Sequence, residues 1–274
     1  MTMSGPDLTA IRPISPVAGY IGGKRQLAKV LVPMINATPH AIYAEAFVGM
    51  GGVFFKRDQR PKVEVINDLS TDVATLFRVL QRHLQAFLDM LKWQVSSRAE
   101  FERLTQTNPE TLTDLERAAR FLFLQRMAFG GKVAGRTMGI STTAPAKFNL
   151  TRLVPLLEEA HARLDGVYIE KLHWRAFLDR WDRPETLFFL DPPYYGVEDY
   201  YGPIFRREEF EDISARLQQL RGRFIMTLND HPEVRRIFAW ATVKPVTLTY
   251  SCAGKPTEGR EVIIRPSPHH ALSI

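Results

Sequence analysis

The residues best suited to chemistry lie in the segment Asp191-Pro192-Pro193-Tyr194, which directly follows an apolar run at 187–190. A carboxylate and a rigid carbonyl at the carboxyl end of a strand face the crevice where open α/β sheets bind ligands. The two prolines fix the backbone and offer no N–H donor, so the segment presents acceptors. An exocyclic base amine that donates to the Asp191 side chain and the Pro192 carbonyl would have its lone pair localised for attack. Tyr194 could stack on the same base.

A glycine-rich turn is the second candidate site. Residues 43–52 read YAEAFVGMGG, a β-like run that ends in glycines, as nucleotide sites of open α/β sheets do. A Gly-x-Gly-x-x-Gly dinucleotide site would need a third glycine where the chain has Phe54. The next apolar run ends at Asp68, whose carboxylate could accept hydrogen bonds from ribose hydroxyls. Taken singly, the turn and the acid are more typical of an ordinary turn and a helix cap, but together they favour a nucleoside site.

The elements that must position these residues alternate along the chain. Strand patterns occur at 41–46, 63–66, 166–170, 186–190 and 224–228, with a final β pair near 241–249 and 261–265. Helix patterns occur at 24–35, from about 52, at 151–164, around 177, at 207–220 and after Asp230 and Pro232. This alternation predicts an α/β fold with a doubly wound, mostly parallel sheet and helices on both faces.

A helical and basic block interrupts the alternation. One long helical pattern runs from Leu76 to Leu91, and further helices are expected at 98–105 and 113–129. The stretch from 120 to 152 contains no Asp or Glu; its cations are Arg120, Arg126, Lys132, Arg136, Lys147 and Arg152. A polyanion is the natural partner of such a stretch, and a solvated basic face is the alternative. We expect a catalytic core at 1–73 and 151–274 and an inserted, mainly helical recognition subdomain at 74–150.

The composition limits the class of protein. The chain has 274 residues, of which 45% are hydrophobic, so it can bury a full core, and its net charge is +6. No apolar run approaches the roughly 20 residues that cross a bilayer, and the start lacks a secretory signal. The single cysteine excludes an internal disulfide, and the histidines show no metal-ligand spacing. We therefore expect a cytoplasmic protein without a metal. The tryptophans are expected to pack inside the molecule: Trp93, Trp174, Trp181 and Trp240.

These segments together resemble the DNA adenine methyltransferase (Dam) family of S-adenosylmethionine-dependent amino-methyltransferases. Residues 20–24, YIGGK, resemble the family's aromatic-x-Gly-Gly-Lys motif, and residues 45–51, EAFVGMG, fit its Glu-x-Phe-x-Gly-x-Gly cofactor motif. Asp68 falls at the ribose-binding acid, 191–194 is the catalytic motif in full, and 260–264, REVII, resembles the closing strand after a loop. The order of these motifs is that of the family's α group, which implies a Rossmann-like methyltransferase core.

The resemblance assigns roles to individual residues. It implies a cofactor site for S-adenosylmethionine made of Tyr20, Gly22, Gly23, Lys24, Glu45, Phe47, Gly49, Gly51, Asp68 and Asp191. Asp191, Pro192 and Tyr194 would be catalytic. Tyr20 stands where many relatives carry tryptophan, which keeps the aromatic surface. The residues expected to contact DNA are Arg126, Lys132 and Arg136.

The implied reaction is methylation of adenine N6 in double-stranded DNA by base flipping and direct displacement, without a metal or a covalent intermediate. Methylation of cytosine N4 is the nearest alternative, although related motifs for that base often begin with serine. Two further hypotheses are a DNA-binding protein without turnover and an RNA methyltransferase. Methylation of a ring carbon would need a reactive thiolate, and Cys252 has none of the surrounding motif. The target sequence, a partnership with a restriction endonuclease and the oligomeric state, a monomer included, stay open.

Overall fold

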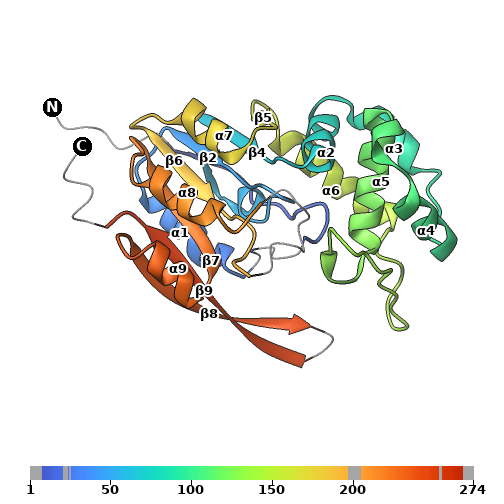
Figure 1. Cartoon of the computed structure of the whole chain (residues 1–274). Coiled ribbons are helices and arrows are strands. Elements are labelled where there is room, and N and C mark those ends of the chain that lie inside the picture. The colour runs from blue at the N-terminus through green and yellow to red at the C-terminus, as the bar shows by residue number, and fades with distance from the viewer. Residues whose placement is uncertain (1–7, 21–23, 25, 197–204, 253–254, 268–274) are drawn as a thin grey trace.

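The computed structural model describes residues 8–20, 24, 26–196, 205–252 and 255–267. Its centre is a seven-stranded sheet in the order β5-β4-β2-β6-β7-β9-β8 (Figure 1). The strands are β2 (Ile42–Glu45), β4 (Val63–Asn67), β5 (Tyr168–Glu170), β6 (Thr186–Leu190), β7 (Arg223–Asn229), β8 (Thr242–Cys252) and β9 (Lys255–Arg265). The first five strands of that order run parallel, and β9 is antiparallel to both neighbours. The predicted α/β fold with a mostly parallel sheet is confirmed.

The strand order places a topological switch point at β2. The chain passes from β2 to β4 and β5 on one side and then returns to β6 on the other side. In sheets of this kind the connecting loops diverge at the switch point and leave a crevice at the carboxyl ends of the strands. The register pairs Glu45 with Ile66 and with Phe189, so β2, β4 and β6 all end near the same level.

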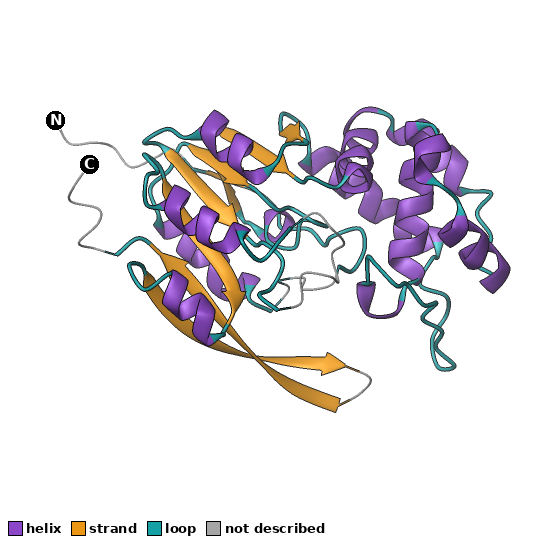
Figure 2. Ribbon diagram, viewed as in Figure 1, coloured by secondary structure: helices purple, strands orange, loops and turns teal. Residues whose placement is uncertain are grey.

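Helices cover both faces of the sheet (Figure 2). One face packs against α1 (Ala28–Ala37) and α6 (Leu150–Arg163), and the other against α7 (Trp174–Trp181), α8 (Glu209–Leu217) and α9 (Pro232–Ile237). Side chains of a strand point alternately to the two faces, and β6 supplies Leu187 and Phe189 to one core and Phe188 and Leu190 to the other. All four are buried, which explains the continuous apolar run of this strand.

The helical block lies to one side of the sheet (Figure 1). It contains α2 (Thr71–Arg82), α3 (Leu84–Leu91), α4 (Arg98–Gln106) and α5 (Asp114–Met127), with short 3₁₀ turns η2 (Pro109–Thr111) and η3 (Phe129–Gly131). A capping box between Thr113 and Glu116 begins α5. Phe77 of α2 and Phe121 of α5 belong to the same apolar cluster as Ile66 of the sheet, so the block and the sheet share one core.

Several expected boundaries differ from the structure. The first helix begins at Ala28 and not at Lys24, and the glycine turn leads to a 3₁₀ helix, η1 (Phe54–Lys56), where an α-helix was expected. The long helix through 76–91 is broken at His83, whose φ of −129° lies outside the helical range; the break redirects α3 so that Phe87 packs in the core.

Two further expectations were wrong. Trp93 was expected to be packed but is 84% exposed, because it follows the end of α3. The strands β8 and β9 pair from Thr242–Arg265 as far as Cys252–Lys255, so most of 252–259, the loop expected before the closing strand, is strand. A two-stranded sheet, β1 (Thr9–Ala10) with β3 (Gln59–Arg60), was not anticipated. None of the helices in the described ranges has the length and apolarity needed to cross a membrane.

Candidate functional site

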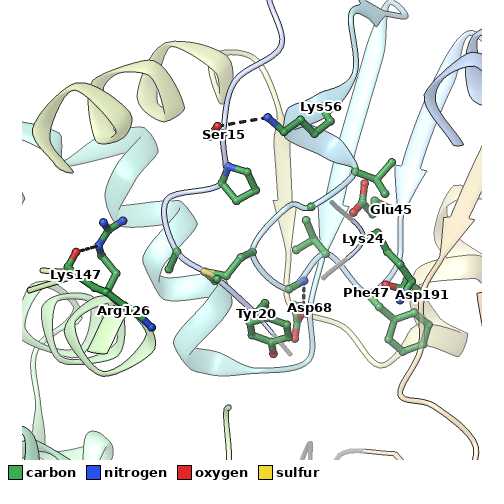
Figure 3. A pocket seen from close by; sticks show the side chains of 18 of the residues that line it. Ser15, Tyr20, Lys24, Glu45, Phe47, Lys56, Asp68, Arg126, Lys147 and Asp191 are labelled. Carbon is green, nitrogen blue, oxygen red and sulfur yellow. Dashed lines mark hydrogen bonds and ion pairs between the residues drawn. The ribbon is translucent and has the colours of Figure 1, made fainter. Parts of the chain in front are cut away.

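A cavity of about 640 Å³ lies at the switch point of the sheet (Figure 3). Three acids line it, each at the carboxyl end of a different strand: Glu45 ends β2, Asp68 follows β4 and Asp191 follows β6. The glycine turn and Pro192 and Pro193 form part of the wall, and another part comes from the N-terminal segment, the end of the helical block and the start of α6. The lining residues of this other part are Ser15, Pro16, Ala18, Gly19, Tyr20, Arg126, Ala144, Pro145, Ala146, Lys147, Asn149 and Arg152.

The glycine turn has the backbone conformation that only glycine adopts readily. Gly49 has a φ of 49° and Gly51 a φ of 71°. A Cβ on Gly49 would lie 3.0 Å from the Tyr20 ring, and one on Gly51 would lie 2.6 Å from the Phe55 ring. The absent side chains therefore leave room for the Tyr20 ring, which lines the cavity, and for the Phe55 ring in the core beside it.

Asp68 ties the glycine turn to the next strand. One carboxylate oxygen accepts from the Gly49 N–H and the other from the Ser70 N–H, both at 2.9 Å. Each oxygen can accept a further hydrogen bond, so the side chain can still bind hydroxyl groups in the cavity. Burial raises the pKa of Asp68 to about 6. The hydrogen bonds from the two N–H groups lower this pKa and so partly offset the effect of burial.

Glu45 is a buried acid at the floor of the cavity, with 2% of its surface exposed. Its Oε2 accepts a hydrogen bond of 2.6 Å from the hydroxyl of Tyr43, which lies two residues earlier on the same face of β2. Burial raises the pKa of Glu45 to about 8, so the carboxyl group is mostly protonated at neutral pH. A cation bound beside it would favour ionisation, which makes this acid suited to an ammonium or sulfonium ligand.

Asp191 and Lys24 form the charged centre of the site. Lys24, only 3% exposed, places its Nζ 2.8 Å from Asp191 Oδ1 and 3.0 Å from the Tyr194 hydroxyl. Thr227 Oγ1 donates to the same Asp191 oxygen at 2.7 Å. The Tyr194 hydroxyl donates to the buried Glu261, which also lies 3.9 Å from Lys24 Nζ.

This arrangement leaves Asp191 as an acceptor. Its Oδ1 is engaged by Lys24 and Thr227, while its Oδ2 has no hydrogen-bond partner among the described residues. Burial raises the pKa of Asp191, and the Lys24 ammonium partly offsets that effect. A carboxylate that is held on one oxygen and open on the other can accept a proton or a hydrogen bond from an amine. Pro192 lines the cavity beside it.

The backbone after Pro193 is held by a side chain of the neighbouring strand. Asn229, the last residue of β7, accepts from the Tyr195 N–H at 2.9 Å and donates to the Tyr195 carbonyl at 3.0 Å. The predicted strand end and helix start at 229–232 are confirmed, although the N-cap of α9 is His231. The reciprocal pair keeps the loop that carries Tyr194 in a fixed orientation.

Sequence reasoning missed several residues of the site. Thr227, Asn229 and the role of Glu261 follow from the register, because β6 lies beside β7 and β7 beside β9. A second, narrow cavity adjoins Asp68 and Phe47, which border both cavities. Its other apolar walls are Ala46, Leu69, Leu172, Trp174, Pro193 and Phe205.

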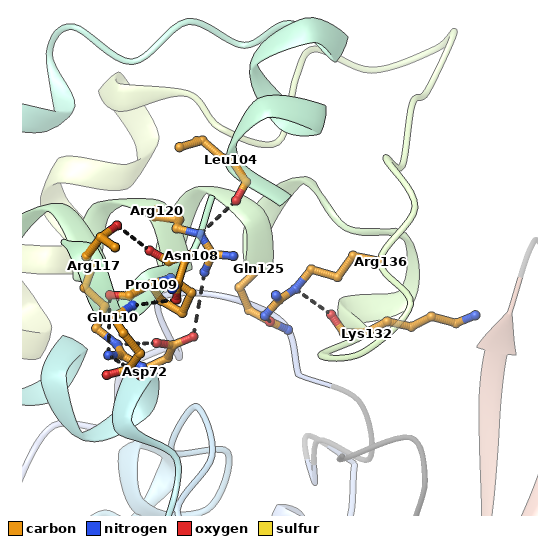
Figure 4. A network of polar contacts seen from close by, with 11 residues as sticks. Asp72, Leu104, Asn108, Pro109, Glu110, Arg117, Arg120, Gln125, Lys132 and Arg136 are labelled. Atoms are coloured by element: carbon orange, nitrogen blue, oxygen red, sulfur yellow. Dashed lines mark hydrogen bonds and ion pairs between the residues drawn. The ribbon is translucent and has the colours of Figure 1, made fainter. Parts of the chain in front are cut away.

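Two of the three residues expected to contact DNA, Arg126 and Arg136, donate hydrogen bonds within the protein. Arg126 lines the large cavity, where its Nη1 donates to the Val17 carbonyl at 2.6 Å and its Nε to the Lys147 carbonyl at 2.9 Å (Figure 3). Arg136 Nε donates to the Lys132 carbonyl at 3.2 Å (Figure 4). The Lys132 side chain is partly exposed and has no hydrogen-bond or ion-pair partner among the described residues. DNA contact by these three residues stays a prediction.

Two other expectations concern the glycines of the 20–24 motif and the absence of a metal site. Gly22 and Gly23 lie outside the described residues. Within the described ranges, no group of three or more His, Cys, Asp or Glu side chains could hold a metal ion.

Comparison with known proteins gives the following similarities. Residues 20–251 match the protein family described as D12 class N6 adenine-specific DNA methyltransferase. Over 212 residues the chain is 26% identical to a DNA N-6-adenine-methyltransferase of Escherichia phage P1, an alignment that covers 71% of this chain and 27% of the phage protein. The chain thus spans about a quarter of that relative. A solved structure from Pyrococcus horikoshii, described as an RNA methyltransferase, has a TM-score of 0.40 and 10% identity, with coverage of 94% of this chain and 91% of the other. A similarity with so low a TM-score gives no information on the function of this chain.

Proposed function

Because the chain belongs to the family of D12 class N6 adenine-specific DNA methyltransferases, we propose that it transfers a methyl group from S-adenosylmethionine to the N6 amine of adenine in double-stranded DNA. The observation that carries this proposal is the cluster of Lys24, Asp191 and Tyr194 at the edge of a cavity that also contains Glu45 and Asp68. The cluster supplies hydrogen-bond acceptors for an amine, and the cavity supplies room and acids for a cationic nucleoside.

The cavity residues fit S-adenosylmethionine in size and charge. The large cavity of about 640 Å³ has room for a nucleoside, Phe47 on its wall offers an aromatic face to an adenine ring, and Asp68 suits the ribose hydroxyls. The glycine turn lets the Tyr20 ring pack against Gly49 at the cavity wall, and Glu45 on the same wall can balance positive charge. When bound, this cofactor supplies a methyl group on a positively charged sulfur, which is already activated for displacement.

The chain's own residues would then orient and polarise the base. The target adenine would leave the duplex and enter beside the Tyr194 ring, with its amine donating to Asp191 Oδ2 and the Pro192 carbonyl. Both bonds favour the lone pair that attacks, since they stabilise the positive charge that develops on nitrogen. The methylated amine must afterwards lose a proton. Asp191 is suited to accept it, because burial raises the pKa of this carboxyl.

The helical block is the part we assign to DNA recognition. The exposed Lys147 and the partly exposed Lys132 can neutralise phosphates, and residues 144–149 of this block also form one wall of the large cavity. Residues 74–150 would then act as the recognition subdomain, with 1–73 and 151–274 as the catalytic core. With DNA as its substrate, the enzyme would work in the cytoplasm.

The test is transfer of labelled methyl groups from S-adenosylmethionine to unmethylated genomic DNA, followed by digestion to nucleosides. We expect N6-methyladenine with the wild-type protein and at least a hundredfold less with Asp191→Asn, which keeps the shape but loses the carboxylate. Asp165→Asn is the matched control, because Asp165 is exposed and does not line the cavity. Label in N4-methylcytosine would show that cytosine is the target base. Label in RNA and not in DNA would contradict the proposed substrate.

A further inference from the structure

The end of helix α5 holds the N-terminal segment against the helical block. The side-chain amide of Gln125 donates to the Gly19 carbonyl at 2.9 Å and to the Gly131 carbonyl at 2.6 Å. The next residue, Arg126, donates to the Val17 carbonyl and to the Lys147 carbonyl. Each of these two side chains therefore joins one carbonyl of the N-terminal segment to one carbonyl of the region at 128–149.

The contact is close and buried. Gln125 is 1% exposed, and both protons of its amide are used, while its Oε1 accepts from Arg136 Nη2 at 3.4 Å (Figure 4). Gly131 has a φ of 68°, and a Cβ there would lie 3.0 Å from the backbone of Gly19 and Tyr20. A buried amide with every donor satisfied fixes its neighbours, because any shift would leave a polar group without a partner.

The segment held in this way leads directly into the cofactor cavity. Tyr20 lies against Gly49 of the glycine turn, and Lys24, a few residues further on, binds Asp191. On the other side, Gly131 and Lys147 belong to the basic stretch that we assign to DNA. A movement of one region relative to the other would therefore strain or break the hydrogen bonds of Gln125 and Arg126.

We propose that Gln125 and Arg126 are positioning residues that couple the DNA-recognition region to the cofactor cavity. Duplex DNA bound to 128–149 would hold Val17, Gly19 and Tyr20 in place and so strengthen cofactor binding. By linkage, bound cofactor strengthens DNA binding by the same factor. This inference rests on the proposed function, since it takes duplex DNA as the ligand of the recognition region.

The experiment measures the affinity for S-adenosylhomocysteine by calorimetry, with and without a duplex that carries the target site found by methylation mapping. We expect the duplex to raise the affinity of the wild-type protein at least about fivefold. In Gln125→Glu a carboxylate faces the two carbonyls, both donated hydrogen bonds are lost, and the ratio falls to about one. The bond from Arg136 to Oε1 is kept in this variant.

The chain offers a closely matched control. The Gln81 amide of α2 also donates to two carbonyls, those of Leu164 and Val167, each at 2.8 Å, but it joins α2 to the segment before β5 and does not line the cavity. Gln81→Glu loses the same kind of bonds, so it should lower stability and keep the wild-type affinity ratio.

A second variant covers the case in which Gln125→Glu does not fold. Arg126→Lys keeps the positive charge but has a single nitrogen, which cannot bond the Val17 and Lys147 carbonyls as the guanidinium does. We expect it to lose the affinity ratio while the salt dependence of DNA binding is unchanged. The coupling would be overturned, even with normal methyl transfer, if the duplex did not change the wild-type affinity for S-adenosylhomocysteine. It would also be overturned if the duplex raised that affinity in both variants as much as in the wild type. Absence of wild-type transfer to any DNA would instead remove the proposed function.

Discussion

At the scale of single residues, Glu45 and Asp68 of the cavity are buried, and burial favours the protonated form of a carboxyl group. Burial raises the pKa of Glu45 to about 8 and that of Asp68 to about 6, both above the values of about 4 in an unfolded chain. The folded state therefore binds protons more tightly than the unfolded state. The two carboxyl groups therefore contribute their whole stabilisation of the folded state below about pH 4, and this contribution is lost as the pH rises towards 8.

We predict that the ligand-free protein loses thermal stability between pH 5 and 8 and that Glu45→Gln loses clearly less, because the amide has no charge to bury. The measurement is Tm by calorimetry across this range for both proteins. Equal slopes of Tm against pH would contradict the raised pKa of Glu45. Glu158→Gln provides the control, since Glu158 is exposed on α6.

The acids and the lysine of the site could be predicted from the sequence because each belongs to a short local motif. Thr227 and Glu261 could not. Thr227 meets Asp191 only because β6 and β7 pair Leu190 with Met226, which places the following residues side by side. Such a contact depends on strand order and register, and a lone Thr or Glu in a β pattern carries no sign of it.

At the scale of elements, the turn at 49–52 shows how one glycine shapes the site. We predict that Gly51→Ala destabilises the protein by about 1–3 kcal/mol and weakens cofactor binding, because the left-handed φ is costly and the new Cβ meets the Phe55 ring at 2.6 Å. Gly130→Ala is the control for φ alone. Its φ is 65° and its Cβ would meet nothing within 4 Å. Unfolding in denaturant and cofactor titration of both variants separate the clash from the strain, and equal losses would show that the clash has no effect.

The strands were easier to predict than the connections between them. A continuous apolar run identifies β6, because both faces of a parallel sheet are buried, and β-branched Val63, Val65 and Ile66 identify β4. The 3₁₀ helix at Phe54 and the break at His83 have no such pattern, since apolar residues continue through both places. They are decided by tertiary packing, which lets Phe55 and Phe87 reach the core.

At the scale of the whole molecule, the basic stretch is not one uniform surface. Arg120 is 7% exposed, donates to the Leu104 carbonyl at 2.8 Å and lies 3.9 Å from Asp72 (Figure 4). Arg126 and Arg136 bond backbone carbonyls, so part of the positive charge serves to hold the block together. The charge run in the sequence indicates a polyanion partner but does not distinguish these structural arginines from cations that are free to reach a ligand.

The exposed cations are therefore the better candidates for phosphate contact. The Lys132 and Lys147 side chains have no hydrogen-bond or ion-pair partner in the described part of the chain. We predict that Lys132→Ala with Lys147→Ala weakens binding to duplexes of any sequence and reduces the slope of log K against log salt by up to about two, roughly 0.9 for each phosphate that is no longer neutralised. Fluorescence anisotropy over a salt series measures both quantities. Lys62→Ala is the control, because this exposed lysine precedes β4, at the end of the strand opposite Asp68. A slope unchanged in the double variant, or reduced equally in the control, would mean that the basic stretch is a solvated face and that DNA is held elsewhere.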